Sequence, residues 1–281
     1  MILPVVSIVV PAHNEETAIA GNLRRLLAGT PPGQFDVVVV ANACSDRTAE
    51  LARQTGVRVL ETPIPGKAHA LRLGDETCRV FPRVYLDADV ELTAESVRAL
   101  VEASRRPGVL ACAPVPRRDV EGATWIARRT HHVHEQLIAP SRALAGVGVY
   151  VLTEEGHARA FPLPDVLSDD GWVHAGFAPD ERAVVPEATS LVRPARTVAA
   201  HLNRRVRVRL GNRQLAELGR PVTENRLRLG SLRTLVTTGR VSALDAACYL
   251  GVLALDRALT RARRLRGGPV RWGTDAGSRI G

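Results

Sequence analysis

Two aspartates, Asp87 and Asp89, lie two positions apart directly after an apolar segment with the pattern of a buried strand. Because side chains alternate along an extended chain, both carboxylates should point the same way. Open α/β sheets bind ligands at the carboxyl ends of their strands. Two carboxylates at such an edge suit a hard divalent cation, Mg²⁺ or Mn²⁺, whose shell is completed by water and phosphate oxygens. We therefore expect a metal site that serves a diphosphate, with a solvated loop pair as the alternative.

The chain has a single lysine, Lys67, among its 38 basic residues. It follows Gly66 and begins a predicted helix, where an ammonium group and free backbone N–H groups can meet at one anionic group. This position favours a contact between Lys67 and a diphosphate. A solvated lysine at a helix start is the alternative.

Strand-like and helix-like segments alternate through the first hundred residues, which predicts a mainly parallel sheet flanked by helices. Apolar periodicity predicts strands at 5–10, 36–41, 57–60 and 83–87 and helices at 15–27, 46–55, 67–79 and 93–104. Beyond residue 108 it predicts strands near 109–113 and 147–152 and a helix near 121–138. From about residue 225 we expect helices and then a disordered Gly-rich tail, 267–281.

Length and composition restrict the class of protein. With 281 residues, 45% of them apolar, the chain can bury one sizeable core. Its four cysteines are too widely spaced for a disulfide framework or a metal finger. Neither a signal peptide nor an apolar stretch of about 20 residues is recognisable. We therefore expect a cytoplasmic location.

Charge is unevenly distributed along the chain. Residues 1–190 carry 19 basic and 24 acidic residues, a net −5, whereas residues 191–281 carry 19 and 5, a net +14. The C-terminal third should therefore face an anionic partner such as phosphate, nucleic acid or a lipid surface.

Four ordered motifs within the first ninety residues resemble the donor half of a family 2 glycosyltransferase with the GT-A fold. They are Val5 to Glu16, Val40 to Thr48, Gly66 to Leu71, and Asp87-Ala88-Asp89. A looser resemblance continues to about residue 215. It implies a GT-A domain at 1–225, with a nucleotide-sugar donor half at 1–106 and an acceptor half at 107–225, followed by a helical region at 226–281. It also implies transfer of a sugar from a nucleoside diphosphate to an acceptor hydroxyl or amine.

By this resemblance, the loops after the first two strands line the nucleoside pocket. The residues implied are Pro11, Ala12, His13 and Glu15 after the first strand, and Asn42 and Asp46 after the second. Family members often have an Asp-Asp pair where this chain has Ala41-Asn42, so the base can be uracil, guanine or thymine. Simple turn chemistry is the alternative for Asn14 and Asn42.

A second acidic pair, Asp169-Asp170, precedes Gly171-Trp172-Val173 and resembles the acidic pair at the acceptor side of the family. Asp170 matches the catalytic base of inverting members. An acceptor hydroxyl must lose its proton as it attacks the anomeric carbon, which requires such a base. An apolar wall formed by Trp172 would raise the pKa of this base. Capping of a helix by Asp169 or Asp170 is the alternative.

Downstream, Arg207 matches the arginine of the family's Q-x-x-R-W pattern, whereas Arg204 and Val208 replace its Gln and Trp. The missing Trp argues against a polymer-extruding synthase. Arg207 is expected to bind the donor diphosphate, with a solvated basic helix face as the alternative. His201 is a candidate third metal ligand or a structural histidine.

Together these features predict a non-processive, metal-dependent, inverting glycosyltransferase. Retaining chemistry on the same fold, a nucleotidyltransferase and a basic nucleic-acid binder are the alternatives; no nucleic-acid-binding motif is present, so nucleic acid is not expected as a partner. Residues 243–255 and the arginines after them fit either a helix packed on the domain or peripheral contact with a membrane. The donor sugar, the acceptor (a small molecule, a glycan or a lipid-linked group) and the oligomeric state stay open.

Overall fold

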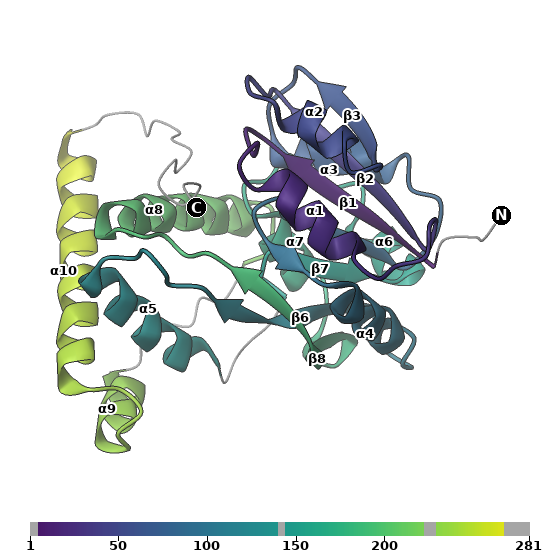
Figure 1. Ribbon diagram of the computed structural model, residues 1–281. Helices are drawn as coiled ribbons and strands as arrows, with labels where there is room; N and C mark the ends of the chain where they lie inside the picture. Colours follow the sequence, from purple (N-terminus) through teal and green to yellow (C-terminus); the bar gives the residue numbers. More distant parts are fainter. Residues whose placement is uncertain (1–4, 140–143, 222–228, 267–281) are drawn as a thin grey trace.

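The computed structural model describes residues 5–139, 144–221 and 229–266, and its strands and helices alternate along residues 6–104 as predicted (Figure 1). The strands are β1 (Val6–Ala12), β2 (Phe35–Asn42), β3 (Arg58–Thr62), β4 (Arg83–Leu86), β5 (Glu91–Leu92), β6 (Ala111–Arg118), β7 (Val149–Leu152) and β8 (Arg182–Val192). The helices are α1 (Ile19–Leu27), α2 (Thr48–Arg53), α3 (Lys67–Asp75), α4 (Ala94–Ser104), α5 (Trp125–Ile138), α6 (Glu154–Ala160), α7 (Asp169–Ala175), α8 (Val198–Glu217), α9 (Leu229–Thr237) and α10 (Ala243–Arg266), with a 3₁₀ turn, η2, at Pro179–Glu181.

The strands form one mixed sheet in the order β3-β2-β1-β4-β7-β6-β8-β5. Four of its seven pairings are parallel: β1 with β2, β1 with β4, β2 with β3, and β6 with β8. The pairings of β7 with β4 and β6, and of β5 with β8, are antiparallel. The predicted mixed, mainly parallel sheet flanked by helices is confirmed. Because β6 runs the same way as β4, the carboxyl ends of β1 to β4, β6 and β8 share one edge with the start of β7.

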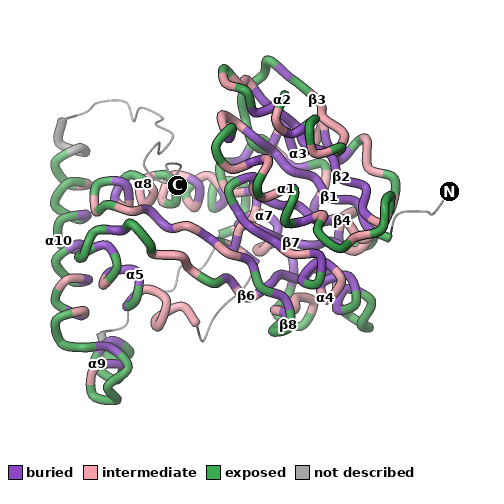
Figure 2. The backbone as a smooth tube through the Cα atoms, viewed as in Figure 1, coloured by how far each residue is buried: buried purple, intermediate pink, exposed green. Residues whose placement is uncertain are grey.

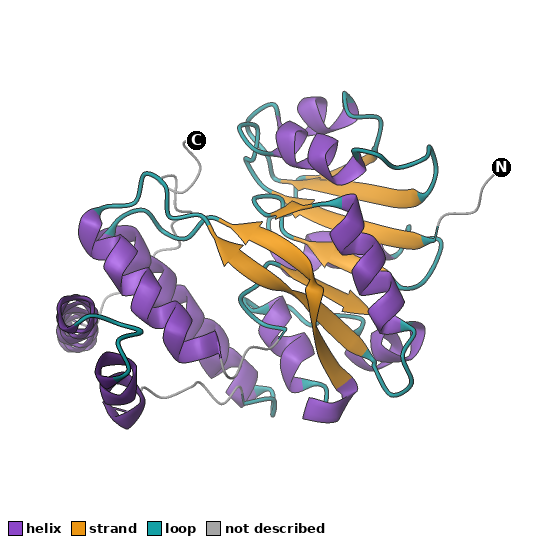
Figure 3. Cartoon of the chain, turned by 60° about the horizontal axis from the view of Figure 1, so that its bottom comes forward, coloured by secondary structure: helices purple, strands orange, loops and turns teal. Residues whose placement is uncertain are grey.

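Alternate residues of the central strands pack against two different layers of helices (Figure 3). Ile8 and Val10 belong to a core formed with α1 and α4, whereas Val9 packs with Leu71 of α3 on the opposite face. The continuous apolar runs of β1 and β2 arise because both faces of these strands are covered.

Strand β8 is an element that the sequence analysis did not indicate. It contains Pro186, and its register with β6 shifts between Pro114 and Val115. A proline and a register shift both interrupt the regular two-residue alternation that identifies a strand.

The helices after α8 share a core with α5. Val133 of α5 packs with Leu232 and Leu235 of α9 and with Tyr249 and Leu253 of α10. Figure 1 shows α5, α8, α9 and α10 grouped beside the sheet, and Figure 2 shows that their buried positions face one another. The predicted domain boundary at residue 225 and the predicted tail at 267–281 lie outside the described residues. Among the helices described, none is long and apolar enough to cross a membrane.

Helix α3 lies so close to the sheet that Gly74 has no space for a side chain. A Cβ atom added there would lie 2.5 Å from Val9 Cγ1 and 3.0 Å from Val40 Cγ2. We expect Gly74→Ala to lower the free energy of unfolding by about 1–3 kcal/mol because the core must shift to admit the methyl group. Urea denaturation measures this change.

The matched control is Gly21→Ala on α1, where an added Cβ meets nothing within 4 Å. This substitution should raise the free energy of unfolding by about 0.5–1 kcal/mol, because alanine favours the helix. A Gly74→Ala variant as stable as the Gly21→Ala variant would contradict the close approach of α3 to the sheet.

Candidate active site at the carboxyl edge of the sheet

The ammonium group of Lys67 is the centre of the candidate site. Its Nζ lies 2.6 Å from Asp87 Oδ1, at the end of β4, and 2.8 Å from Asp169 Oδ1, at the start of α7. Burial alone would lower the pKa of Lys67, but the charges of Asp169, Asp87 and Asp170 outweigh burial and raise it. Lys67 is therefore a permanent cation between two carboxylates.

The negative charge around Asp87 exceeds what the single positive charge of Lys67 neutralises. Its pKa is raised to about 6 by burial and by the nearby charges of Asp169 and Asp89, which together outweigh the attraction of Lys67. In addition, Asp169 Oδ2 is buried and has no hydrogen-bond partner among the described residues. The site thus holds carboxylate charge that a bound cation could neutralise.

The start of α3 is fixed by the end of β2. Gly66 has φ 137°, a backbone conformation that favours glycine, and its N–H donates to Asn42 Oδ1 at 3.2 Å. Asn42 Nδ2 donates to the Ala12 carbonyl at 2.8 Å, and the Asn42 carbonyl lies 2.7 Å from His13 Nδ1. Asn42 therefore ties the ends of β1 and β2 to the helix that carries Lys67, in agreement with the turn-chemistry alternative; its role toward a nucleoside stays a prediction.

Asp46 holds the loop after β2 against the loop after β1. Its Oδ1 accepts hydrogen bonds from the Thr48 N–H (3.0 Å) and hydroxyl (2.5 Å), and its Oδ2 accepts from the Glu16 N–H (3.1 Å). Burial would raise the pKa of Asp46, but these hydrogen bonds lower it. The Glu15 N–H in turn donates to Thr48 Oγ1 at 2.7 Å, and the Glu15 side chain is buried.

Asp170 is held by amide and hydroxyl groups. Its Oδ2 accepts from the Gly146 N–H at 2.6 Å, and its Oδ1 accepts from Ser168 Oγ at 2.9 Å and the Gly171 N–H at 2.7 Å. Burial would raise the pKa of Asp170, but the charge of Lys67 and these hydrogen bonds lower it. Ser168 occupies the N-cap position of α7, so neither aspartate caps this helix.

The expectation of a raised pKa for Asp170 is therefore wrong. It assumed that Trp172 forms an apolar wall beside the carboxylate. Instead, the Trp172 indole N–H donates to the Ala160 carbonyl at 3.1 Å, and the Arg220 guanidinium carbon lies 3.7 Å from the centre of the Trp172 ring.

Two glycines and a tyrosine at the start of β7 complete the site, and sequence reasoning did not identify them. Gly146 donates to Asp170, and a Cβ on Gly148 would lie 2.4 Å from Val90 Cγ2 in the turn that carries Asp89. The Tyr150 hydroxyl is buried without a hydrogen-bond partner among the described residues. The signal that could have revealed them is the sequence Gly-Val-Gly directly before a strand.

Within the ranges that the structure describes, no contact with Lys67 is found for the remaining residues predicted for the site. Pro11 and Ala12 are buried at the end of β1, His13 is half-buried, and Asp89 is exposed in the turn after β4. Arg207 is exposed on α8, one helical turn before Gly211, where an added Cβ would lie 3.1 Å from Ser168 Cβ. Arg207 therefore lies on the side of α8 that faces the Asp169–Asp170 turn.

His201 lies in a cluster of histidines and arginines between α5 and α8. Its ring packs edge-on against His131 with centroids 5.2 Å apart, and its pKa falls to about 3 because of burial and the nearby charges of His131 and Arg205. In the described part of the chain, no contact is found between His201 and Asp87 or Asp89. These described residues also contain no group of three or more His, Cys, Asp or Glu side chains that could hold a metal ion.

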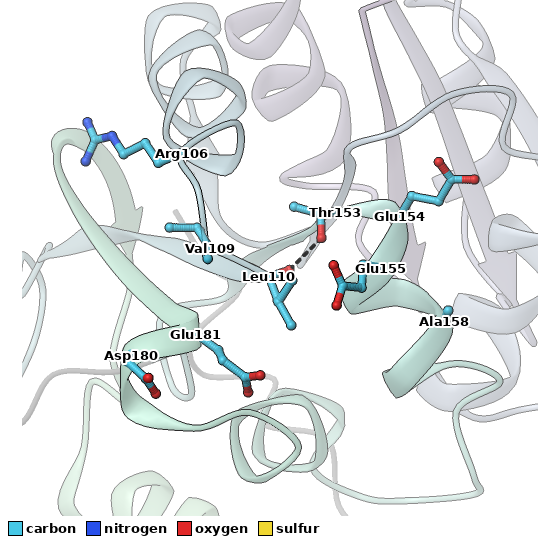
Figure 4. A pocket seen from close by; sticks show the side chains of 10 residues that line it. Arg106, Val109, Leu110, Thr153, Glu154, Glu155, Ala158, Asp180 and Glu181 are labelled. Carbon is cyan, nitrogen blue, oxygen red and sulfur yellow. Dashed lines mark hydrogen bonds between the residues drawn. The ribbon is translucent and has the colours of Figure 1, made fainter.

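A cavity of about 10 Å³ lies among the site residues, which are Lys67, Leu71, Tyr85, Leu86, Asp87, Gly148, Tyr150, Asp169 and Asp170. A larger hollow of about 780 Å³ lies at the opposite edge of the sheet, near the start of β6 and the end of β7 (Figure 4). There the Glu155 and Glu181 side chains point inward, but the Glu181 carboxylate is already paired with Arg159. The small cavity is the candidate site because the Lys67 ammonium group and the carboxylates of Asp87, Asp169 and Asp170 line it.

The charge of Lys67 should control how the free energy of unfolding depends on pH. The folded-state pKa of Asp87, about 6, exceeds its ordinary 3.8, so ionisation of Asp87 reduces stability as pH rises from about 4 through 6. Without Lys67 this loss should grow. We expect Lys67→Met to cost about 1–2 kcal/mol more at pH 8 than at pH 5, a value discounted because both groups are partly exposed.

Urea denaturation of the variant and the parent protein at both pH values gives this difference. Lys67→Arg, which keeps the charge, is the control and should show a pH dependence close to that of the parent. An equal loss at pH 5 and pH 8 for Lys67→Met would show that Lys67 does not neutralise these carboxylates.

Comparisons with known proteins agree on the type of domain. A family model for glycosyl transferase family 2 matches residues 7–161, which is more than half of the 281 residues. An undecaprenyl-phosphate 4-deoxy-4-formamido-L-arabinose transferase of Edwardsiella ictaluri is 29% identical over 143 residues, 47% of this chain and 43% of the relative. The chain spans less than half the length of the first curated relatives it matches.

Two solved structures share the fold. A mannosyltransferase of Pyrobaculum calidifontis, in complex with GDP-Man and Mn²⁺, superposes with a TM-score of 0.61 over 96% of this chain and 77% of its own, at 19% identity. A glucosyl-3-phosphoglycerate synthase of Mycobacterium tuberculosis, in complex with Mn²⁺, UDP and glucosyl-3-phosphoglycerate, gives 0.55 over 78% and 81%, at 20% identity. These likenesses show the GT-A fold, and the family match shows that this chain belongs to glycosyl transferase family 2.

Proposed function

We propose that this protein transfers a sugar from a nucleoside diphosphate to an acceptor hydroxyl or amine, without processive polymerisation. The observation that carries the proposal is the position of Lys67 between Asp87 and Asp169 at the carboxyl edge of the sheet. This is the edge at which open α/β sheets bind ligands. Family membership supports the reaction class, and the site supplies a cation for phosphate and carboxylates for a metal and a base.

The donor diphosphate is proposed to bind at Lys67 and Arg207. Lys67 begins α3, where its ammonium group adds to the free N–H groups of the first turn. Arg207 is exposed on α8, one helical turn from Gly211, which lies close to Ser168, so its guanidinium is free to bind two phosphate oxygens. The nucleoside is proposed to lie over the loops after β1 and β2, along Pro11, Ala12, His13, Glu15, Asn42 and Asp46.

The residues present fit a divalent cation. Mg²⁺ commonly takes one or two protein carboxylates and completes its shell with water and phosphate, so a cage of three protein ligands is not required. Asp87 and Asp89 are proposed as the ligands, and burial together with the nearby charges of Asp169 and Asp89 raises the pKa of Asp87, as expected where negative charge is in surplus. His201 is not proposed as a third ligand, because its ring packs against His131 between α5 and α8. When bound, Mg²⁺ or Mn²⁺ would neutralise charge that develops on the departing diphosphate. Lys67 would then share its charge between the carboxylates and the phosphates.

Asp170 is proposed as the general base of an inverting transfer. The Gly146 and Gly171 N–H groups fix its two oxygens, and its lowered pKa keeps it ionised at neutral pH, the state that a general base needs before it accepts a proton. Asp169, whose Oδ1 holds Lys67, is proposed to position that ammonium group rather than to move a proton. Retaining chemistry remains the alternative, and the configuration of the product distinguishes the two.

The substrates to test follow from the relatives. The solved neighbours are described with UDP or GDP-Man, and the curated relative is named for an undecaprenyl-phosphate acceptor. We propose a UDP- or GDP-linked sugar as the donor, with small-molecule, glycan and lipid-phosphate acceptors as the classes to screen. A thermal-shift screen with and without Mn²⁺ identifies the donor, because a ligand that binds the folded state raises the melting temperature.

With the donor from this screen, we expect Asp170→Asn to lower turnover by about 10²- to 10⁴-fold, the usual contribution of a general base, while donor affinity stays nearly unchanged. The substitution keeps the shape of the side chain and removes its basic oxygen. Turnover and calorimetric donor affinity, each with and without Mn²⁺, are the measurements.

Asp169→Asn is the matched control, one position away in the same turn. It should weaken donor binding through Lys67 more than it lowers turnover at saturating donor. Near-normal turnover in Asp170→Asn, or a larger turnover loss in Asp169→Asn, would reject Asp170 as the base. A product that keeps the anomeric configuration of the donor would reject the inverting mechanism.

A further inference from the structure

Helix α10 has a second apolar face that no described residue covers. Its inner face packs on α5 and α9 through Ala246, Tyr249 and Leu253. On the opposite side, helical spacing aligns a continuous run of apolar and small residues, which we call the outer stripe: Leu244, Ala247, Cys248, Gly251, Ala254, Leu255, Ala258, Leu259 and Ala262. Its leucines are substantially exposed, Leu244 by 50%, Leu255 by 45% and Leu259 by 38%. Figure 2 shows α10 at the margin of the molecule, with its outer side exposed.

The charges of α10 are sorted by face. Its two carboxylates point inward: Asp245 pairs with Arg129 at 2.5 Å, and Asp256 pairs with Arg205 at 2.9 Å and Arg209 at 2.6 Å. Asp256 is only 5% exposed. The exposed charges described on this helix are Arg257 and Arg261, which lie three positions after Ala254 and Ala258 and so border the outer stripe along its alanine edge. The uncovered face is therefore apolar, and the charges described along its alanine edge are cationic.

An amphipathic aromatic side chain lies beside the first turns of α10. Trp125, at the start of α5, is 47% exposed, and the Arg129 guanidinium carbon lies 4.3 Å from the centre of its ring. Because Arg129 also binds Asp245, the indole is held beside the first turns of α10. Tryptophan is enriched at membrane–water interfaces, where its ring can contact both acyl chains and headgroups.

We propose that the outer stripe docks on the surface of an anionic lipid bilayer, with Leu244, Leu255 and Leu259 inserted among the acyl chains and Arg257 and Arg261 at the headgroups. An apolar helix face with arginines along one edge, whose long side chains can reach the headgroups, has the features of an interfacial helix. A second copy of the chain is a poorer complement, because α10 offers no exposed carboxylate to pair with the arginines of a facing α10. The proposal is independent of sugar transfer, because it concerns a surface outside the candidate site.

Flotation of the full chain with vesicles tests the proposal without any assay of sugar transfer. The probes are vesicles of phosphatidylcholine alone and of phosphatidylcholine with phosphatidylglycerol. We expect binding to the anionic vesicles that weakens as salt rises, because salt screens the arginines. The double variant Leu255→Gln/Leu259→Gln should lower the partition coefficient at least about tenfold, since it removes two inserted side chains without changing charge. Arg257→Gln/Arg261→Gln should lower it about tenfold on anionic vesicles only.

The matched control is Leu218→Gln, an equally exposed leucine (48%) at the end of α8, which should bind vesicles like the parent protein. Circular dichroism confirms that each variant is folded. Absence of binding by the parent protein to anionic vesicles overturns the proposal, as does an equal loss in Leu218→Gln. A dimer in light scattering that Leu255→Gln/Leu259→Gln converts to monomer, together with no vesicle binding, would assign the outer stripe to a second copy and also overturn it.

Discussion

The ion pairs of Lys67 with Asp87 and Asp169 are the interaction on which the candidate site depends. They join the first residue of α3, the end of β4 and the first residue of α7, which lie 20 and 82 positions apart in sequence. Each partner is placed by independent packing: α3 by the close approach of Gly74 to β1 and β2, and the turn before α7 by contacts of Gly171 and Gly211. The core therefore fixes one cation among several carboxylates, and the proposed diphosphate site rests on this charge arrangement.

In the protein without a ligand, this pairing offsets repulsion among the carboxylates of the site. Unshielded, Asp87, Asp89, Asp169 and Asp170 would repel one another at neutral pH, and Lys67 offsets part of that repulsion. A metal ion that takes over the neutralisation of Asp87 would free the ammonium group for the donor phosphates. The metal ion and the donor diphosphate would then favour each other's binding. The metal ion would neutralise Asp87, and the diphosphate would pair with the Lys67 ammonium group that Asp87 no longer holds.

Local sequence signals predicted the elements and residues whose position follows from strand ends. Asp87 and Lys67 were placed correctly beside one edge of the sheet, because an apolar run and a glycine at a helix start are local features. The tie that Asn42 makes to Gly66, the pairing of Lys67 with Asp169 and the buried Tyr150 hydroxyl depend on contacts between distant segments. Strand β8 was not predicted because Pro186 and a register shift interrupt its alternation. The lowered pKa of Asp170 comes from the charge of Lys67, which is distant in sequence, and from hydrogen bonds of Ser168 and backbone N–H groups, which the residue types alone do not reveal.

The most direct test of the central claim uses the single lysine of the chain. Reductive methylation with ¹³C-formaldehyde labels Lys67 and the N-terminal amine while keeping their charge, and a Lys67→Arg variant identifies the Lys67 signal in NMR spectra. UDP or GDP with Mg²⁺ should shift that signal strongly as phosphate replaces a carboxylate partner, whereas uridine or guanosine should leave it nearly in place. A Lys67 signal that stays unmoved while calorimetry shows the diphosphate bound would contradict the account.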